Sequence, residues 1–270
     1  MIVFRPAVLT KHNAEIDFLP LYFHFNGMCK LLRRGFKFCR QLRKAVKIAA
    51  VVKFTVIGQR VLNNAVVGQF AVAKGFAAVS SKSGVVFAHT SDISIDPKGR
   101  VHTFCCAVPG CWHVMGVTQS AGLSLKWFRD NFAWSEMETA ASMGVDPYYL
   151  MDKEADSVPI GANRLLYMPY LNGERTPHLD PNVRGAFVGL STMHKKKDML
   201  RAVMEGVSYS LRDCVEGMRE MNINIDDMMA CGGGGTSPLW RQMLADLYAC
   251  NVKTTANKEG PALGVALLAA

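Results

Sequence analysis

Residues 228–255 decide the predicted fold, and they read MMACGGGGTSPLWRQMLADLYACNVKTT. Met228–Cys231 is a short apolar run of strand length. Gly232–Gly235 is expected to be a loop, after which the Thr-Ser pair supplies a helix cap. A proline then takes the first helical position, which proline favours. The stretch therefore predicts a strand, a glycine-rich connection and a helix in direct succession.

The same alternation continues to the end of the chain. Asn251–Thr255 is expected to be a strand, and Pro261–Ala270 opens a further helical pattern. That pattern stops without a cap, which indicates a chain cut at its C-terminus. Strand, helix, strand and helix in this order predict an α/β layer with a largely parallel sheet.

Upstream, residues 83–221 alternate between strand and helix patterns. Strands are expected at Gly84–Ala88, Val101–Ala107, Trp112–Val117, Arg164–Met168 and Gly185–Leu190. Helices are expected at Thr118–Phe132, Ser135–Met151 and Asp198–Met221. The last helix, with Asp198 as its cap, carries an apolar stripe at i, i+3, i+4 spacing: Leu200, Val203, Met204, Val207, Leu211, Cys214, Val215 and Met218.

Charge divides the chain into two unlike parts. Residues 1–90 hold fourteen Lys and Arg against Glu15 and Asp17, a net charge of +12, whereas residues 91–270 carry a net charge of −3. No acidic residue occurs from Phe18 to Ser91, although a folded surface normally mixes both signs. Because residues 1–82 also lack a clean hydrophobic period, we expect a basic segment there that need not fold natively. A domain at 83–270 is expected to follow.

Three explanations fit the acid-free run: a basic nucleic-acid-binding arm, an organelle-targeting segment, and out-of-frame sequence never selected to fold. Apolar stretches such as Phe18–Phe25 and Ala45–Ile57 argue against a solvated arm. Targeting segments are short and begin at the terminus, which argues against the second explanation. We therefore expect no nucleic-acid partner.

Membrane insertion and metal binding are not expected. Lys47, Lys53, Arg60 and Lys74 interrupt the apolar stretches, and a membrane span needs about 20 apolar residues. The eight cysteines contain no C-x-x-C pair, so we expect no zinc site and reduced thiols in the cytoplasm. Cys105, Cys106 and Cys111 are expected to be core thiols, and His102 and His113 to pack in or beside strands.

The glycine run is the first candidate binding site. Gly232, Gly233, Gly234 and Gly235 lie between a strand and a helix start, where backbone N–H groups approach a ligand closely and positive partial charge suits a phosphate. No Lys follows at the Walker A position, and the spacing does not fit G-x-G-x-x-G. A nucleotide contact and a tight packing turn both remain open.

A second candidate is the polar stretch NGERTPH at residues 172–178, together with Asp180. It contains two acids, an Arg and a His within nine residues. It could be a polar site at a strand end. We favour a solvated loop whose charges pair with each other.

These motifs together resemble the FGGY family of carbohydrate kinases. Gly185–Leu190, seven spacer residues and Asp198–Glu205 match the long C-terminal signature of that family. Tyr170–Asp180 and Cys231–Asp246 are similar to its xylulokinase branch, and Glu259–Gly264 is similar to the next family block. Trp112–Gly116 and Gly122–Asp130 fit as well. The resemblance covers about residues 83–270.

The resemblance implies an α/β fold of the actin-like, ribonuclease-H-like kind, with a mixed sheet and flanking helices. Such kinases close two domains over a cleft, and the second domain holds most of the MgATP. The implied reaction transfers the γ-phosphate of ATP to D-xylulose, with a possible homodimer as the assembly. Nucleotide contacts are implied at Gly232–Gly235 and Ser237, and at Ser83 and Gly84 in a phosphate-binding turn.

The sequence departs from the family in two places. The family's Gly-Thr-Ser-Gly turn falls at Ser81–Gly84, where Ser81 and Lys82 replace its first two residues. The family's catalytic Asp falls within residues 18–91, which contain no acid, so we assign no catalytic residue and no metal ligand. The first, sugar-binding domain has no counterpart. We therefore expect an inactive, truncated piece of a xylulokinase, with a nucleotide-binding remnant or a nucleic-acid-binding protein as the alternatives.

Overall fold

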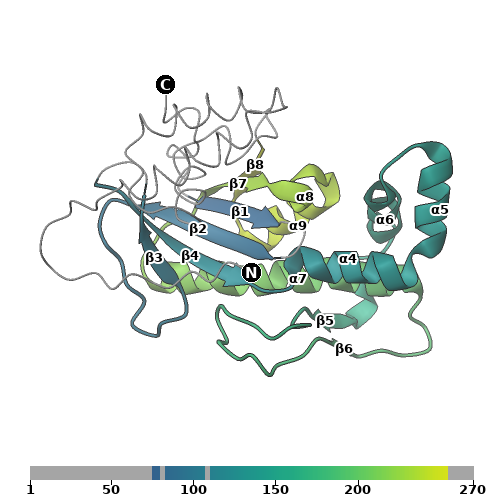
Figure 1. Cartoon of the computed structure of the whole chain (residues 1–270), viewed down its shortest axis with the longest axis horizontal. Helices are drawn as coiled ribbons and strands as arrows, with labels where there is room; N and C mark the ends of the chain where they lie inside the picture. Colours follow the sequence, from purple (N-terminus) through teal and green to yellow (C-terminus); the bar gives the residue numbers. More distant parts are fainter. Residues whose placement is uncertain (1–74, 80–82, 107–109, 255–270) are drawn as a thin grey trace, which may run out of the picture. The chain divides into compact units, whose positions relative to one another are not determined.

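The computed structural model describes residues 75–79, 83–106 and 110–254 of the chain (Figure 1). The chain divides after Thr55 into two units, and every described residue lies in the second, Val56–Ala270. The helix expected at Pro261–Ala270, the turn residues Ser81 and Lys82, and most of the basic segment lie outside the described residues.

A six-stranded mixed sheet forms the centre of the described fold. Its strands are β1 (Gly75–Val79), β2 (Gly84–Thr90), β3 (His102–Cys105), β4 (Trp112–Thr118), β7 (Asp227–Cys231) and β8 (Asn251–Lys253). They lie in the order β3-β4-β2-β1-β7-β8. The pairs β1–β2, β2–β4 and β3–β4 are antiparallel, whereas β1–β7 and β7–β8 are parallel. The parallel arrangement expected for the end of the chain is therefore confined to β1, β7 and β8.

Strand β1 lies upstream of Ser83, in the segment where we expected no regular element. It pairs on one side with β2 and on the other with β7, from Gly75 opposite Met228 to Ala78 opposite Cys231. Its five residues, GFAAV, are too few, and lack the polar alternation, to produce a period-2 pattern in the sequence. The sheet thus begins before the expected boundary of the domain.

Helices and a separate hairpin complete the described fold. The helices are α4 (Ala121–Phe132), α5 (Trp134–Met143), α6 (Pro147–Asp156), α7 (Lys196–Glu220), α8 (Gly232–Thr236) and α9 (Pro238–Tyr248), with a 3₁₀ turn η1 at Ala162–Arg164. Strands β5 (Leu166–Met168) and β6 (Ala186–Val188) form a two-stranded antiparallel sheet. None of the helices in the described part of the chain is both long and apolar enough to cross a membrane.

Two helix expectations are corrected by local backbone geometry. The single helix expected at Ser135–Met151 is two helices, because Gly144 adopts φ +66° and ends α5, after which the Asp146 side chain caps α6 by accepting from Tyr148 N. Asp198 is not the cap of α7. It lies three residues inside the cap position, where its carboxylate accepts from Lys195 N at 2.7 Å.

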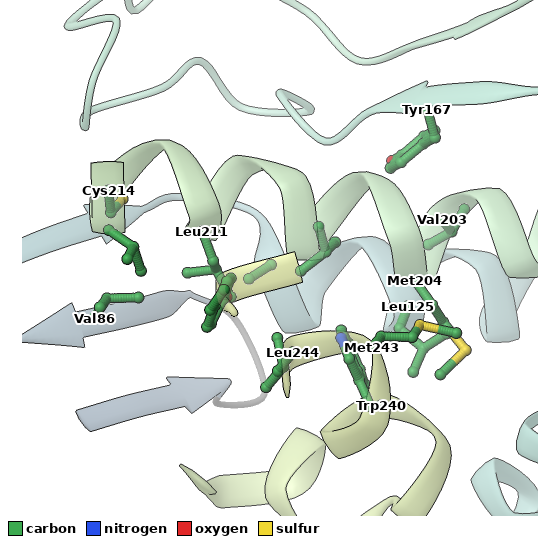
Figure 2. Packing of buried hydrophobic residues seen from close by; sticks show 14 of the residues in the cluster. Val86, Leu125, Tyr167, Val203, Met204, Leu211, Cys214, Trp240, Met243 and Leu244 are labelled. Atoms are coloured by element: carbon green, nitrogen blue, oxygen red, sulfur yellow. The ribbon is translucent and has the colours of Figure 1, made fainter. Parts of the chain in front are cut away.

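Helix α7 organises the core because it packs on two sides. It lies between the large sheet and the β5–β6 hairpin (Figure 1), and Figure 2 shows Tyr167 of β5 on one side of it and Val86 and Leu244 on the other. All eight residues of the expected apolar stripe are buried. A Cβ at Gly206 would collide with the carbonyl of Tyr167, so glycine permits the close approach of the hairpin.

We expect Leu211→Ala to lower the free energy of unfolding by about 2–5 kcal/mol, because it removes a fully buried side chain and leaves a cavity between α7 and the sheet. Urea unfolding followed by circular dichroism measures this loss. Tyr209→Ala, on the 40% exposed side of the same helix, is the matched control, and its effect is expected to stay within about 1 kcal/mol. Equal losses for both variants would contradict this packing of α7.

Candidate functional site

The carboxyl ends of three strands meet at one edge of the sheet. Strands β1 and β7 are parallel, and β4 runs in the same direction because it is antiparallel to β2, which is antiparallel to β1. Ala78 pairs with Cys231, and Gly84 pairs with Thr118. This edge therefore brings together Ser83 and Gly84, the end of β4 and the glycine run, as Figure 1 shows for β1, α4 and α8. Ligands of α/β proteins bind at such an edge.

The glycine run is a short helix, α8, and not the expected loop. Gly232 begins it with φ +72°, a conformation that favours glycine. Side chains bind its carbonyls: Thr236 Oγ1 donates to Gly233 O at 2.7 Å, and Arg241 Nη1 donates to Gly235 O at 2.8 Å. These hydrogen bonds hold a helical turn that glycine propensity alone would not predict.

Within the run, two glycines face solvent and two face the protein. Gly232 and Gly233 are exposed, whereas Gly234 and Gly235 are buried. A Cβ at Gly235 would lie 2.9 Å from the carbonyl carbon and oxygen of Ala230, but a Cβ at Gly233 would meet nothing within 4 Å. Packing therefore accounts for Gly235. Among the described residues, Gly233 has no neighbour that requires its small size, so a ligand approaching its backbone would explain it.

Ser237 and Gly84 have structural roles, and for Ser237 the helix cap predicted from the Thr-Ser pair is confirmed. Ser237 is 8% exposed and caps α9 by accepting from Trp240 N at 3.0 Å. Its hydroxyl also hydrogen-bonds Asp152 of α6, which partly offsets the rise that burial causes in the pKa of that carboxyl. A Cβ at Gly84 would lie 2.8 Å from Ala121 Cβ, Leu211 Cδ2 and Thr118 Oγ1, so packing also accounts for this glycine.

The junction between β4 and α4 belongs to the same edge, and sequence reasoning missed it as a binding element. Ser120 precedes the twelve-residue helix α4, yet its side chain makes no capping hydrogen bond. The residue is 0% exposed, and its Oγ has no partner among the described residues. The start of a helix attracts negative charge. Its only signal in the sequence is the pair Thr118 and Ser120 at the start of the expected helix, either of which could cap it.

The polar stretch at 172–180 is only partly the solvated loop that we favoured, because Arg175, His178 and Asp180 are exposed but other residues of the stretch are buried. Glu174 is 4% exposed and Thr176 is fully buried. Glu174 Oε1 accepts from Gln119 N at 2.8 Å and from Arg175 N at 2.7 Å, and burial raises the pKa of this carboxyl. The stretch is held by the end of β4. Among the described residues, its charged side chains form no ion pair with each other.

The cysteines and histidines of β3 and β4 lie toward the opposite edge. Cys106 Sγ lies 3.7 Å from His113 Nδ1. Burial raises the pKa of Cys106 to about 12 and lowers that of His113 to about 4, so the thiol and the imidazole are both neutral at pH 7. Cys105 is exposed, which corrects the expectation of a core thiol there. In the described ranges, no group of three or more His, Cys, Asp or Glu is arranged to hold a metal ion.

Two other carboxylates, Asp92 and Asp96, follow β2. Their place after a strand predicts a surface turn for both; Asp92 is exposed, whereas Asp96 begins a turn that ends at Gly99 but is buried. Asp96 is 4% exposed and accepts from Arg100 Nε at 3.0 Å, which together with backbone N–H bonds lowers its pKa to about 2. It therefore fixes a turn and holds Arg100, whose carbonyl accepts from Thr176 Oγ1.

Comparison with known proteins agrees with this arrangement. Residues 79–270 match the model of the FGGY family of carbohydrate kinases, C-terminal domain. The chain is 40% identical over 188 residues to a xylulose kinase of Bacillus subtilis (70% of this chain, 36% of the relative) and 39% identical over 211 residues to a gluconokinase of the same organism (77% and 40%).

Solved structures give the same result. The crystal structure of a xyloylose kinase from Brucella ovis is similar with a TM-score of 0.66 and 30% identity over 77% of this chain and 41% of that one. The ligand-bound xylulose kinase of Lactobacillus acidophilus has a TM-score of 0.66 and 27% identity over 77% and 40%. The chain spans about two fifths of the length of these relatives. It belongs to the FGGY family of carbohydrate kinases, and its described part has the actin-like fold of their C-terminal domain.

Proposed function

We propose that this chain supplies the nucleotide-binding part of an ATP-dependent sugar kinase. The observation that carries the proposal is the edge where β1 and β7 end side by side, because Ser83 and Gly84 lie at this same end of the sheet as the exposed Gly232 and Gly233, with β1 between them. The buried and unpartnered Ser120 Oγ lies at the same edge. Backbone N–H groups and a helix start fit the phosphates of a nucleotide.

The proposed reaction transfers the γ-phosphate of ATP to a sugar hydroxyl. Mg²⁺ would enter with the nucleotide, because it prefers phosphate oxygens, water and one or two carboxylates over an all-protein site. D-xylulose is the first candidate sugar, since the relatives include several xylulose kinases. Gluconate is the second, because gluconokinases match at 39% and 40% identity over a longer stretch of the chain. A cytoplasmic location and a homodimer are part of the same proposal.

We expect the purified chain to bind MgATP and ADP with one site per chain, because the phosphate-binding edge lies within the described residues. Isothermal titration calorimetry measures this binding. AMP is the matched control, and we expect it to bind more weakly because it lacks the β- and γ-phosphates. Absence of heat with ATP, together with salt-dependent binding of single-stranded DNA, would support the nucleic-acid alternative instead.

A further inference from the structure

Glu174 is a buried carboxyl whose position no requirement of packing explains. It is 4% exposed, and Oε2 has no hydrogen-bond partner among the described residues. No Lys, Arg or His of the described chain forms an ion pair with it. Burying a carboxyl in this way is costly, and an apolar side chain would fill the same space without that cost. The hydrogen bonds that Oε1 accepts offer a reason for a carboxyl at this position.

Glu174 Oε1 is hydrogen-bonded to Gln119, the residue that joins β4 to α4. Oε1 accepts from Gln119 N at 2.8 Å, across 55 residues of sequence. Gln119 follows Thr118, which pairs with Gly84, and precedes Ser120, whose side chain does not cap the helix. The start of α4 is therefore oriented from outside the helix, by a side chain of the 172–180 stretch.

The stretch itself is anchored independently of Glu174. Thr176 N donates to Val117 O at 3.1 Å, and Val117 N donates to Thr176 Oγ1 at 3.2 Å. Thr176 Oγ1 also donates to Arg100 O at 2.8 Å. Strand β3 pairs with β4 only from Trp112 to Met115. Thr176 therefore binds the backbone of β4 at Val117, beyond the end of that pairing. These contacts give Glu174 a fixed support, as a positioning residue requires.

We propose that Glu174 is a positioning residue for nucleotide phosphates, acting through Gln119 on the β4–α4 junction beside Ser83 and Gly84. The inference rests on the proposed function, because it assumes that phosphates bind at this edge. Glu174 does not itself touch the nucleotide. The hydrogen bond from Gln119 N to Glu174 Oε1 fixes the position of the β4–α4 backbone to which a phosphate would bind.

The test compares ATP, ADP and adenosine binding by calorimetry on the full chain and on four variants. Glu174→Ala and Glu174→Asp each lose the reach to Gln119 N, and we expect them to weaken ATP and ADP by roughly tenfold. Adenosine affinity stays unchanged because adenosine has no phosphate. Glu174→Gln keeps a carbonyl oxygen for Gln119 N and restores ATP affinity to within about twofold. Thr176→Val, which loosens the same stretch without touching Gln119, lowers the midpoint of thermal unfolding but leaves the ratio of ATP to adenosine affinity unchanged.

The outcomes separate the inference from the proposed function. If the unmodified chain binds ATP and Glu174→Ala binds it equally well, the inference alone is wrong. If Glu174→Ala weakens ATP and adenosine alike, Glu174 is only structural and the inference is again wrong. If Glu174→Ala does not fold, the comparison of Glu174→Asp with Glu174→Gln decides between the same results. If the unmodified chain binds no ATP, the proposed function fails and the inference falls with it.

Discussion

The purified 270-residue chain is expected not to phosphorylate D-xylulose when it is supplied with MgATP. Phosphoryl transfer needs a base within about 2.6–3.2 Å of the attacking hydroxyl and a sugar held in line with the γ-phosphate. Residues 18–91 contain no carboxylate, Asp92 follows the end of β2 that lies away from the glycine run, and Asp96 is paired with Arg100, which lowers its pKa to about 2. Loss of the base costs about 10²–10⁴ in rate, and loss of sugar positioning costs several kcal/mol more. We therefore expect turnover below detection.

A coupled assay of ADP release, with D-xylulose and then gluconate as the acceptor, measures this directly. A full-length xylulose kinase under the same conditions is the positive control. ADP release that requires sugar and disappears in Gly233→Val would show that this chain builds a complete site, and the assignment of an inactive piece would then be wrong.

The second large effect is expected from Gly233→Val, which we expect to reduce ATP affinity by about a hundredfold or more. Gly233 is exposed, and its missing Cβ would meet no protein atom within 4 Å, so the protein itself tolerates a side chain there. A valine side chain would instead stand between the backbone N–H groups and the phosphates. Calorimetry with MgATP, accompanied by thermal unfolding, separates lost binding from lost folding.

Gly235→Ala is the matched control on the same short helix. Its new methyl group would press on the backbone of Ala230 at 2.9 Å, so we expect it to lower the unfolding midpoint, an effect that Gly233→Val does not share. ATP affinity that is unchanged in Gly233→Val would remove the glycine run from the nucleotide site. A large loss of stability in Gly233→Val would show instead that packing explains all four glycines.

Hydrophobic periodicity in the sequence predicted the elements that bury one apolar face of their own. The stripe from Leu200 to Met218 on α7 is buried as predicted, because the face that packs on the sheet needs only its own i, i+3, i+4 pattern. Strand β1 was missed because its order comes from β2 and β7 on either side, and five residues without polar alternation carry no period of their own. Helix α8 was missed because the side chains of Thr236 and Arg241 hold a glycine turn together.

The sequence offered candidate binding residues, but it did not reveal the long-range contacts that position them. The glycine run and Ser83–Gly84 were proposed as binding residues from residue types and from resemblance, while their place at the same end of the sheet depends on the parallel pairing of β1 with β7. Glu174 looked like a solvated charge, because acids within a polar stretch are normally exposed. Its burial comes from contact with Gln119, a long-range pairing that a single sequence does not contain.

The pairing of Ala78 with Cys231 joins residues that are 153 positions apart, the difference between 231 and 78. The antiparallel strands β2, β3 and β4 are neighbours in sequence and close short loops, whereas β7 must return to β1 after most of the chain has been synthesised. Contacts of such long separation form slowly because loop closure costs entropy before the strands gain stability. The proposed phosphate-binding edge is therefore among the last parts of the sheet to assemble, and a nascent chain completes the proposed nucleotide site only after β7 has docked.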